Sequence, residues 1–168
     1  MLIMATDPAL YKLAECVGQG LLARHWRLVL AESCTGGWIA KVITDVPGSS
    51  GWFERGFVTY SNTAKVDLLA VPPALLDSRG AVSRETVDAM AAGALRHSQA
   101  EIALAVSGIA GPDGGSPDKP VGTVWLAWAV HDRPGHSRCY TFPGDREAVR
   151  RQAVAVALQG VLELLDAG

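Results

Sequence analysis

The chain has 168 residues, of which 49% are hydrophobic and 19% charged, and its formal net charge is −2. This composition is that of an ordinary globular protein, and the length fits one domain, so we expect residues 1–168 to form a single domain. A weakly acidic chain without a run of lysine or arginine lacks the electrostatic footprint of a nucleic-acid-binding protein. No apolar stretch reaches the roughly 20 residues that a membrane span needs, so no membrane partner is expected either.

Three widely spaced cysteines, Cys16, Cys34 and Cys139, form no C-x-x-C pair, and no histidine pair has the spacing of a zinc site. We therefore expect reduced thiols and no bound metal. The amino terminus lacks the basic start and apolar centre of a signal peptide, which favours a cytoplasmic protein.

The first half of the chain alternates between the periodicities of helices and strands. The expected elements are a helix opened by Asp7-Pro8, a strand over 26–31, a helix from Trp38, a strand over 56–60 and a helix that begins at Ser61 or Asn62. Lys65 then falls in the first turn of that last helix.

In the second half, Val71-Pro72-Pro73 breaks the chain and Ser83 is a suitable N-cap for the next helix. The remaining expected elements are strands over 101–107, 121–130 and 138–142, with a loop at 132–135, and a closing helix over 146–165. Strands that alternate with helices and then follow one another directly predict a three-layer α/β/α sandwich. Its mixed, mostly parallel sheet has about five strands, with about five helices around it.

Two glycine-rich segments, 31–37 and 107–115, each follow an apolar run that is typical of a buried strand. Each turn should therefore lie at the carboxyl end of a strand, which is where open α/β sheets bind ligands. The sequence predicts a functional site at this edge of the sheet.

Ser33 lies in the first of these turns, just before a helix whose free N–H groups favour developing negative charge. It can act as a nucleophile, but Ser33 or Thr35 can equally be the N-cap of that helix. The pair Gly36-Gly37 favours a site, because side chains there would crowd a ligand close to the backbone. Cys34 is a rival nucleophile, since a helix amino terminus can depress the pKa of a thiol.

Lys65 and Tyr60 lie between the two glycine-rich segments and can complete a catalytic site. A lysine that is partly buried beside a serine can act as its base, and Tyr60 can relay the proton. The alternatives are a solvated surface lysine and a tyrosine at the rim that bonds to backbone.

The second glycine-rich segment matches neither G-x-G-x-x-G nor G-x-x-x-x-G-K-[ST]. A phosphate can still bind at a plain glycine turn, and the nearest basic residues are Lys119 and Arg146. Arg146 is the better candidate, because a guanidinium can donate two hydrogen bonds to a phosphate at once.

Four ordered motifs together resemble the CinA carboxyl-terminal domain family: residues 31–37, 57–65, 108–115 and 119–124. The resemblance extends from about Leu10 to Leu165 and implies a three-layer α/β/α fold and a homo-oligomer. It also implies nicotinamide-nucleotide amidase activity, in which nicotinamide mononucleotide is hydrolysed to nicotinate mononucleotide and ammonia in pyridine-nucleotide (NAD) recycling.

Carried over by position, Ser33 is similar to the family's nucleophile, Lys65 to its general base and Tyr60 to its helper in proton transfer. Backbone N–H groups near Thr35 and Gly36 hold the tetrahedral intermediate in this interpretation, and neither a metal nor an organic cofactor takes part. The expected substrate-binding residues are Thr35, Gly36, Gly37, Ser107, Gly108, Ala110, Gly111 and Arg146. Two features depart from the family pattern: Ser107 stands where threonine is usual, and the large amino-terminal domain of many members is absent.

Two other functions remain open from the sequence. One is hydrolysis of a different amide or ester, and the other is a non-catalytic nucleotide-binding domain that acts through a protein partner in competence or the DNA-damage response. A pure binding domain has no use for Ser33, Tyr60 and Lys65 together, and all three are present.

Overall fold

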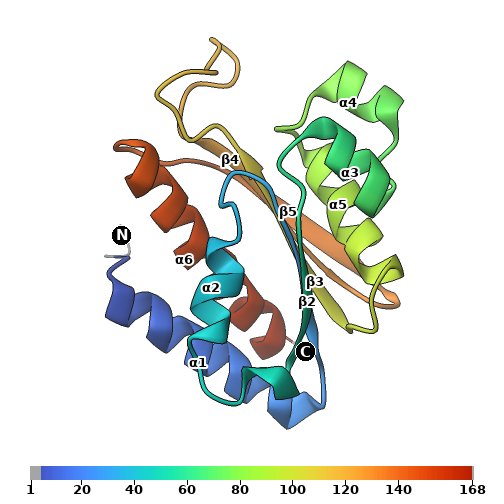
Figure 1. The fold of residues 1–168 in the computed structure, drawn as a ribbon, viewed down its shortest axis with the longest axis vertical. Helices are drawn as coiled ribbons and strands as arrows, with labels where there is room; N and C mark the ends of the chain where they lie inside the picture. Colours follow the sequence, from blue (N-terminus) through green and yellow to red (C-terminus); the bar gives the residue numbers. More distant parts are fainter. Residues whose placement is uncertain (1–4, 168) are drawn as a thin grey trace.

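A single sheet forms the centre of the computed structural model, which describes residues 5–167 (Figure 1). Its strand order is β2-β1-β3-β4-β5, and the strands are β1 (Leu28–Glu32), β2 (Phe53–Val58), β3 (Ile102–Gly108), β4 (Thr123–Val130) and β5 (Arg133–Thr141). Strands β2, β1 and β3 are parallel, whereas β4 is antiparallel to both β3 and β5. The mixed, mostly parallel sheet expected from the sequence is confirmed.

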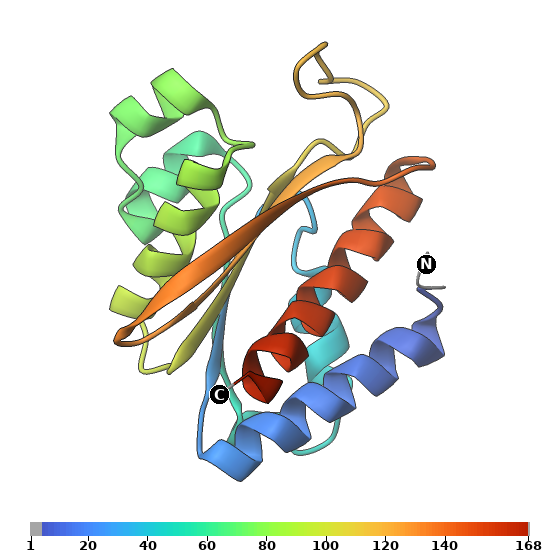
Figure 2. The same ribbon diagram turned by 180° about the vertical axis from the view of Figure 1, so that it is seen from behind.

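Helices cover both faces of the sheet, as Figures 1 and 2 show from opposite sides. The α-helices of residues 5–167 are α1 (Asp7–Arg24), α2 (Trp38–Thr44), α3 (Asn62–Leu69), α4 (Pro73–Arg79), α5 (Arg84–Arg96) and α6 (Arg146–Asp166). Helices α1, α2 and α6 lie on one face, and α3, α4 and α5 lie on the other. The three-layer α/β/α sandwich is therefore confirmed. Across the part of the chain that the structure describes, no helix combines the length and apolar character that crossing a membrane requires.

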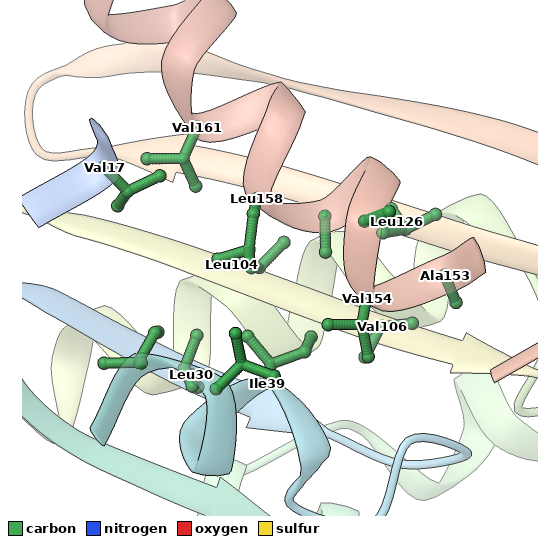
Figure 3. Packing of buried hydrophobic residues seen from close by; sticks show 14 of the residues in the cluster. Val17, Leu30, Ile39, Leu104, Val106, Leu126, Ala153, Val154, Leu158 and Val161 are labelled. Carbon is green, nitrogen blue, oxygen red and sulfur yellow. The ribbon is translucent and has the colours of Figure 1, made fainter. Parts of the chain in front are cut away.

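The central strands are buried on both faces, which explains why they appear in the sequence as continuous apolar runs. Leu30 of β1 and Leu104 of β3 pack against α2 and α6, where Ile39 and Leu158 meet them (Figure 3). On the opposite face β1 and β3 present smaller side chains, among them Ala31, to α5.

Two elements differ from the sequence expectation. Helix α4 was missed, because Pro72 and Pro73 were interpreted only as a break, although proline also fits the first turn of a helix. The loop expected at 132–135 was wrong, because β5 already begins at Arg133. Pro134 is tolerated there because β5 is the edge strand of the sheet.

The carboxyl ends of β1, β2 and β3 meet at one edge of the sheet, since these strands are parallel. The first turns of α3 and α6 lie at the same edge, and the loop over 109–122 projects beyond it (Figures 1 and 2). The fold thus gathers residues from distant parts of the sequence at this edge.

Candidate active site

Ser33 and Lys65 form a direct pair at the carboxyl edge of the sheet. Ser33 follows β1, and Lys65 lies in α3, whose N-cap Ser61 accepts a hydrogen bond from the N–H of Ala64. The Lys65 Nζ lies 3.0 Å from the Ser33 Oγ and 2.8 Å from the carbonyl oxygen of Thr59. Lys65 is only 1% exposed, so the alternative of a solvated surface lysine is wrong.

Burial determines the protonation of this lysine. Removal from water lowers the pKa of the Lys65 amine, and the neighbouring Cys34 opposes this effect in part. Lys65 also forms no ion pair within residues 5–167 that would hold its proton. A neutral amine at this distance can accept the proton of the serine hydroxyl.

The turn after Ser33 is organised by Glu32, the last residue of β1. The Glu32 carboxylate is buried and accepts four hydrogen bonds. Its donors are the Thr35 hydroxyl and the N–H groups of Gly37, Ile39 and Ala40, at 2.6, 3.1, 3.1 and 2.9 Å. The suggestion that Ser33 or Thr35 caps α2 is therefore wrong: Glu32 binds the amino terminus of the helix and leaves the Ser33 hydroxyl to Lys65.

The free backbone N–H groups near Ser33 agree only in part with those expected near Thr35 and Gly36. The Gly36 N–H donates to the Ser33 carbonyl at 3.0 Å and is not available to a ligand. The N–H groups of Cys34, Thr35 and Ala110 have no acceptor within residues 5–167. Cys34 and Ala110 line the cavity beside Ser33, whereas Thr35 does not. The residue after a nucleophile commonly supplies such an oxyanion donor.

A cavity of about 240 Å³ opens onto the serine and lysine. Its lining residues are Ser33, Cys34, Tyr60, Asn62, Lys65, Ala81, Val82, Ser107, Gly108, Ala110 and Arg146. Thr35, Gly36, Gly37 and Gly111, which the sequence analysis also assigned to substrate binding, do not line it. A larger cavity of about 440 Å³ between β5 and α6 contains neither Ser33 nor Lys65.

Three lining residues were missed by the sequence analysis. Asn62 follows the N-cap of α3 and lies within the motif that carries Lys65, so its place in the chain could have indicated it. Ala81 and Val82 lie between α4 and α5 in a segment without a motif, and no sequence signal marks them.

Arg146 brings a positive charge to the cavity. Its Nη1 donates to the Gly111 carbonyl at 2.8 Å, and its Nη2 donates to the Tyr60 hydroxyl at 2.9 Å. It forms no ion pair with a carboxylate of the described chain. Lys119 instead donates to the carbonyl of Arg79 and lines a different cavity, so of the two basic candidates the structure brings Arg146 to the site.

Tyr60 lies at the rim of the cavity and is 60% exposed. Its hydroxyl contacts Arg146, and within residues 5–167 it bonds to neither Ser33 nor Lys65. The structure therefore places Tyr60 with the cation of the site.

Cys34 is a poor nucleophile in this environment. Burial raises the pKa of its thiol to about 12, so the thiolate is scarce at neutral pH. Among residues 5–167, no histidine lines the cavity to serve as its base. The serine is thus the better nucleophile of the two.

These features define a three-layer α/β protein with a serine–lysine pair at the carboxyl edge of its sheet. The chain belongs to the CinA C-terminal domain family, whose model matches residues 10–165.

Relatives and solved structures of similar length support this assignment. The chain is 58% identical over 154 residues to the nicotinamide-nucleotide amidohydrolase PncC of Escherichia coli K12, covering 92% of this chain and 93% of that protein. It is 57% identical to the protein of the same name from Pseudomonas putida, covering 90% of this chain and 94% of that one. The competence/damage inducible protein CihA from Agrobacterium tumefaciens superposes with a TM-score of 0.91 at 41% identity, covering 98% and 99% of the two chains.

Proposed function

We propose that this protein is a nicotinamide-nucleotide amidase that hydrolyses nicotinamide mononucleotide to nicotinate mononucleotide and ammonia. Near full-length relatives at 57% and 58% identity carry the name of this amide hydrolase. The observation that carries the proposal is the contact between the buried Lys65 amine and the Ser33 hydroxyl in a cavity beside Arg146.

Lys65 acts as the general base in the first step. The neutral amine takes the hydroxyl proton as the Ser33 oxygen attacks the carboxamide carbon, and the carbonyl oxygen becomes an oxyanion. The Thr59 carbonyl accepts a hydrogen bond from the same amine and fixes its position. The N–H of Cys34 is the best-placed donor for the oxyanion, with the N–H of Ala110 as a second candidate.

The protonated Lys65 then serves as the acid. Its proton passes to the amide nitrogen as the carbon–nitrogen bond breaks, so ammonia leaves and a nicotinoyl ester remains on Ser33. Water attacks this ester with Lys65 again as the base, and cleavage of the ester bond returns the proton to the serine oxygen. Every proton transfer uses this one amine, so the mechanism needs no second base.

The dimensions and charge of the site fit part of a nucleotide. The cavity of about 240 Å³ is smaller than the roughly 300–1,000 Å³ of typical ligand sites, so we assign it the pyridine ring and carboxamide. Arg146 lies at the same cavity with unused N–H donors and is assigned to the phosphate. Tyr60 orients Arg146 in this proposal.

The role in NAD recycling, the cytoplasmic location and the homo-oligomer are proposed on the sequence and its resemblance alone. A non-catalytic nucleotide-binding domain, the alternative function, accounts for a cation at the cavity such as Arg146. It does not account for the buried amine of Lys65 beside a serine. Burying an amine opposes its charged form, and such a group is typical of an active site.

The test is ammonia release from nicotinamide mononucleotide, with nicotinate mononucleotide identified as the second product. Nicotinamide riboside, which lacks the phosphate, is the matched control substrate. We expect turnover of the nucleotide and much weaker turnover of the riboside. Nucleotide binding without any release of ammonia would instead support the non-catalytic domain.

A further inference from the structure

The turn that carries Ser33 contains two glycines in the left-handed region, with φ of 59° at Gly36 and 98° at Gly37. Glycine adopts many backbone conformations, so such a turn has little rigidity of its own. Glu32 holds the N–H groups on the α2 side of the turn. On the other side, the Thr35 carbonyl accepts a hydrogen bond from the Trp38 N–H at 3.0 Å, and the carbonyls of Cys34 and Thr35 both contact a residue that has no part in the mechanism above.

That residue is Arg150, in the second turn of α6. Its Nε donates to the Cys34 carbonyl at 3.0 Å, and its Nη2 donates to the Thr35 carbonyl at 3.1 Å. The guanidinium carbon also lies 5.3 Å from the centre of the Trp38 ring, a distance at which a cation is attracted to the ring face. Within residues 5–167 Arg150 forms no ion pair, so its polar contacts are with this turn.

These two contacts set the orientation of the Cys34 peptide group and add to the Trp38 N–H bond that holds the Thr35 carbonyl. A trans peptide is planar, so its carbonyl and its N–H point in opposite directions. With the carbonyls of Cys34 and Thr35 turned toward Arg150, the N–H groups of Thr35 and Gly36 point away from it, and the Gly36 N–H binds the Ser33 carbonyl. A flipped peptide would release this bond and shift the backbone that carries Ser33 and the Cys34 N–H.

We propose that Arg150 is a positioning residue for the nucleophile turn. It holds the Cys34 and Thr35 carbonyls so that the Ser33 hydroxyl and the Cys34 N–H keep the geometry that amide hydrolysis needs. The proposal rests on the proposed function. It requires arginine, because a lysine ammonium is a point donor and does not span two carbonyls as the planar guanidinium does.

The experiment compares Arg150→Lys and Arg150→Ala with Arg151→Ala in nicotinamide mononucleotide hydrolysis. Arg151 is a matched control, because it lies in the same helix and its guanidinium also contacts the face of the Trp38 ring. Its hydrogen bonds go to Ala5, Asp7 and Glu147 and not to the turn. We expect both Arg150 variants to lose about 10- to 100-fold in kcat with KM within about twofold, the signature of misplaced reacting groups. Arg151→Ala should stay within about twofold of the wild type in both constants.

Two further readouts separate positioning from a general loss of structure. Methylguanidinium added to Arg150→Ala should restore part of kcat and leave Arg151→Ala unchanged. Phenylmethanesulfonyl fluoride should label Ser33 more slowly in both Arg150 variants than in the wild type, as followed by intact mass. This labelling needs no nucleotide, so it tests Arg150 even if the wild type releases no ammonia and the proposed substrate is wrong.

Full kcat in Arg150→Lys, or equal loss in the Arg150 and Arg151 variants, would overturn the proposal. If Arg150→Ala does not fold, the milder Arg150→Lys variant decides by the same kcat and labelling criteria. A wild type that neither releases ammonia nor is labelled at Ser33 would overturn both the proposed function and the role of Arg150.

Discussion

The Lys65 amine lies 3.0 Å from the Ser33 hydroxyl, although the two residues are 32 positions apart in the sequence. One follows β1 and the other lies in α3, so the parallel sheet and the helix after β2 together create the pair. Because the amine is buried and has no carboxylate partner within residues 5–167, its pKa lies below that of an ordinary lysine. In the proposed mechanism this contact joins the nucleophile to the base that accepts its proton.

The pH dependence of catalysis should report this base. Burial lowers the pKa of Lys65, so kcat/KM should rise with pH with an apparent pKa below the value of about 10.4 of an ordinary lysine. An initial-rate profile for nicotinamide mononucleotide measures this. The Lys65→Arg variant is the control, since its guanidinium keeps the charge but cannot lose its proton. An apparent pKa at or above the ordinary value, or an active Lys65→Arg variant, would contradict this role.

The same pKa shift affects stability. At pH values between the lowered pKa of folded Lys65 and its ordinary value, the unfolded chain binds more protons than the folded chain. The contribution of Lys65 to the free energy of unfolding therefore rises with pH in this range. Urea denaturation at several alkaline pH values should show this slope in the wild type, and it should disappear in Lys65→Met.

Cys34 should be dispensable for chemistry. Its thiol has a pKa raised to about 12 by burial, so Cys34→Ala should keep kcat within about threefold of the wild type. The measurement is ammonia release, accompanied by a thermal melt to confirm folding. A loss of about 100-fold or more in a folded variant would return the thiol to the list of candidate nucleophiles.

Arg146 should contribute to substrate binding more than to chemistry. Arg146→Met removes the cation that lines the cavity, so we expect KM for the mononucleotide to rise about 10- to 100-fold with a smaller change in kcat. The riboside, which carries no phosphate, should respond little to this change. Tyr60→Phe, which removes only the hydroxyl that Arg146 contacts, should have a weaker effect of the same kind. Equal loss for nucleotide and riboside would show that Arg146 does not bind the phosphate.

A further prediction concerns the close approach of α5 to α3. A Cβ at Gly93 would collide with the backbone carbonyl of Leu69, so Gly93→Ala should lower the free energy of unfolding by about 3 kcal/mol. Gly20→Ala, in the interior of α1, is the matched control. Its Cβ would meet only a flexible Leu165 methyl at 2.9 Å, and the gain in helix propensity offsets that contact. Urea denaturation compares the two; equal stability would show that the helices separate without cost.

The sequence predicted the layers and the position of the site, because alternating strands and helices place parallel strand ends at one edge. It could not choose between Ser33 as a cap and Ser33 as a nucleophile. That choice depends on the Glu32 side chain, which reaches across to the start of α2, a contact that exists only in three dimensions. The sequence already favoured Arg146 over Lys119, and the structure brings Arg146 to the cavity and Lys119 to a different one.

The burial of Lys65 was also beyond the sequence alone. A lysine in the first turns of a helix is usually solvated, and only the folded surroundings of α3 remove its amine from water. The resemblance to the family implied a role for Lys65 as the general base, and the burial of its amine supports that proposal. Helix α4 was missed for a local reason. Proline fits both a break in the chain and the start of a helix, so this signal alone could not decide between them.

The most direct test of this account is ammonia release from nicotinamide mononucleotide by the wild type and by a folded Ser33→Ala variant. The account predicts release by the wild type without added metal and a loss of at least about 1,000-fold in the variant, because the attacking oxygen is removed. Comparable release by both proteins would contradict the assignment of Ser33 as nucleophile. No release by the wild type would contradict the amidase itself.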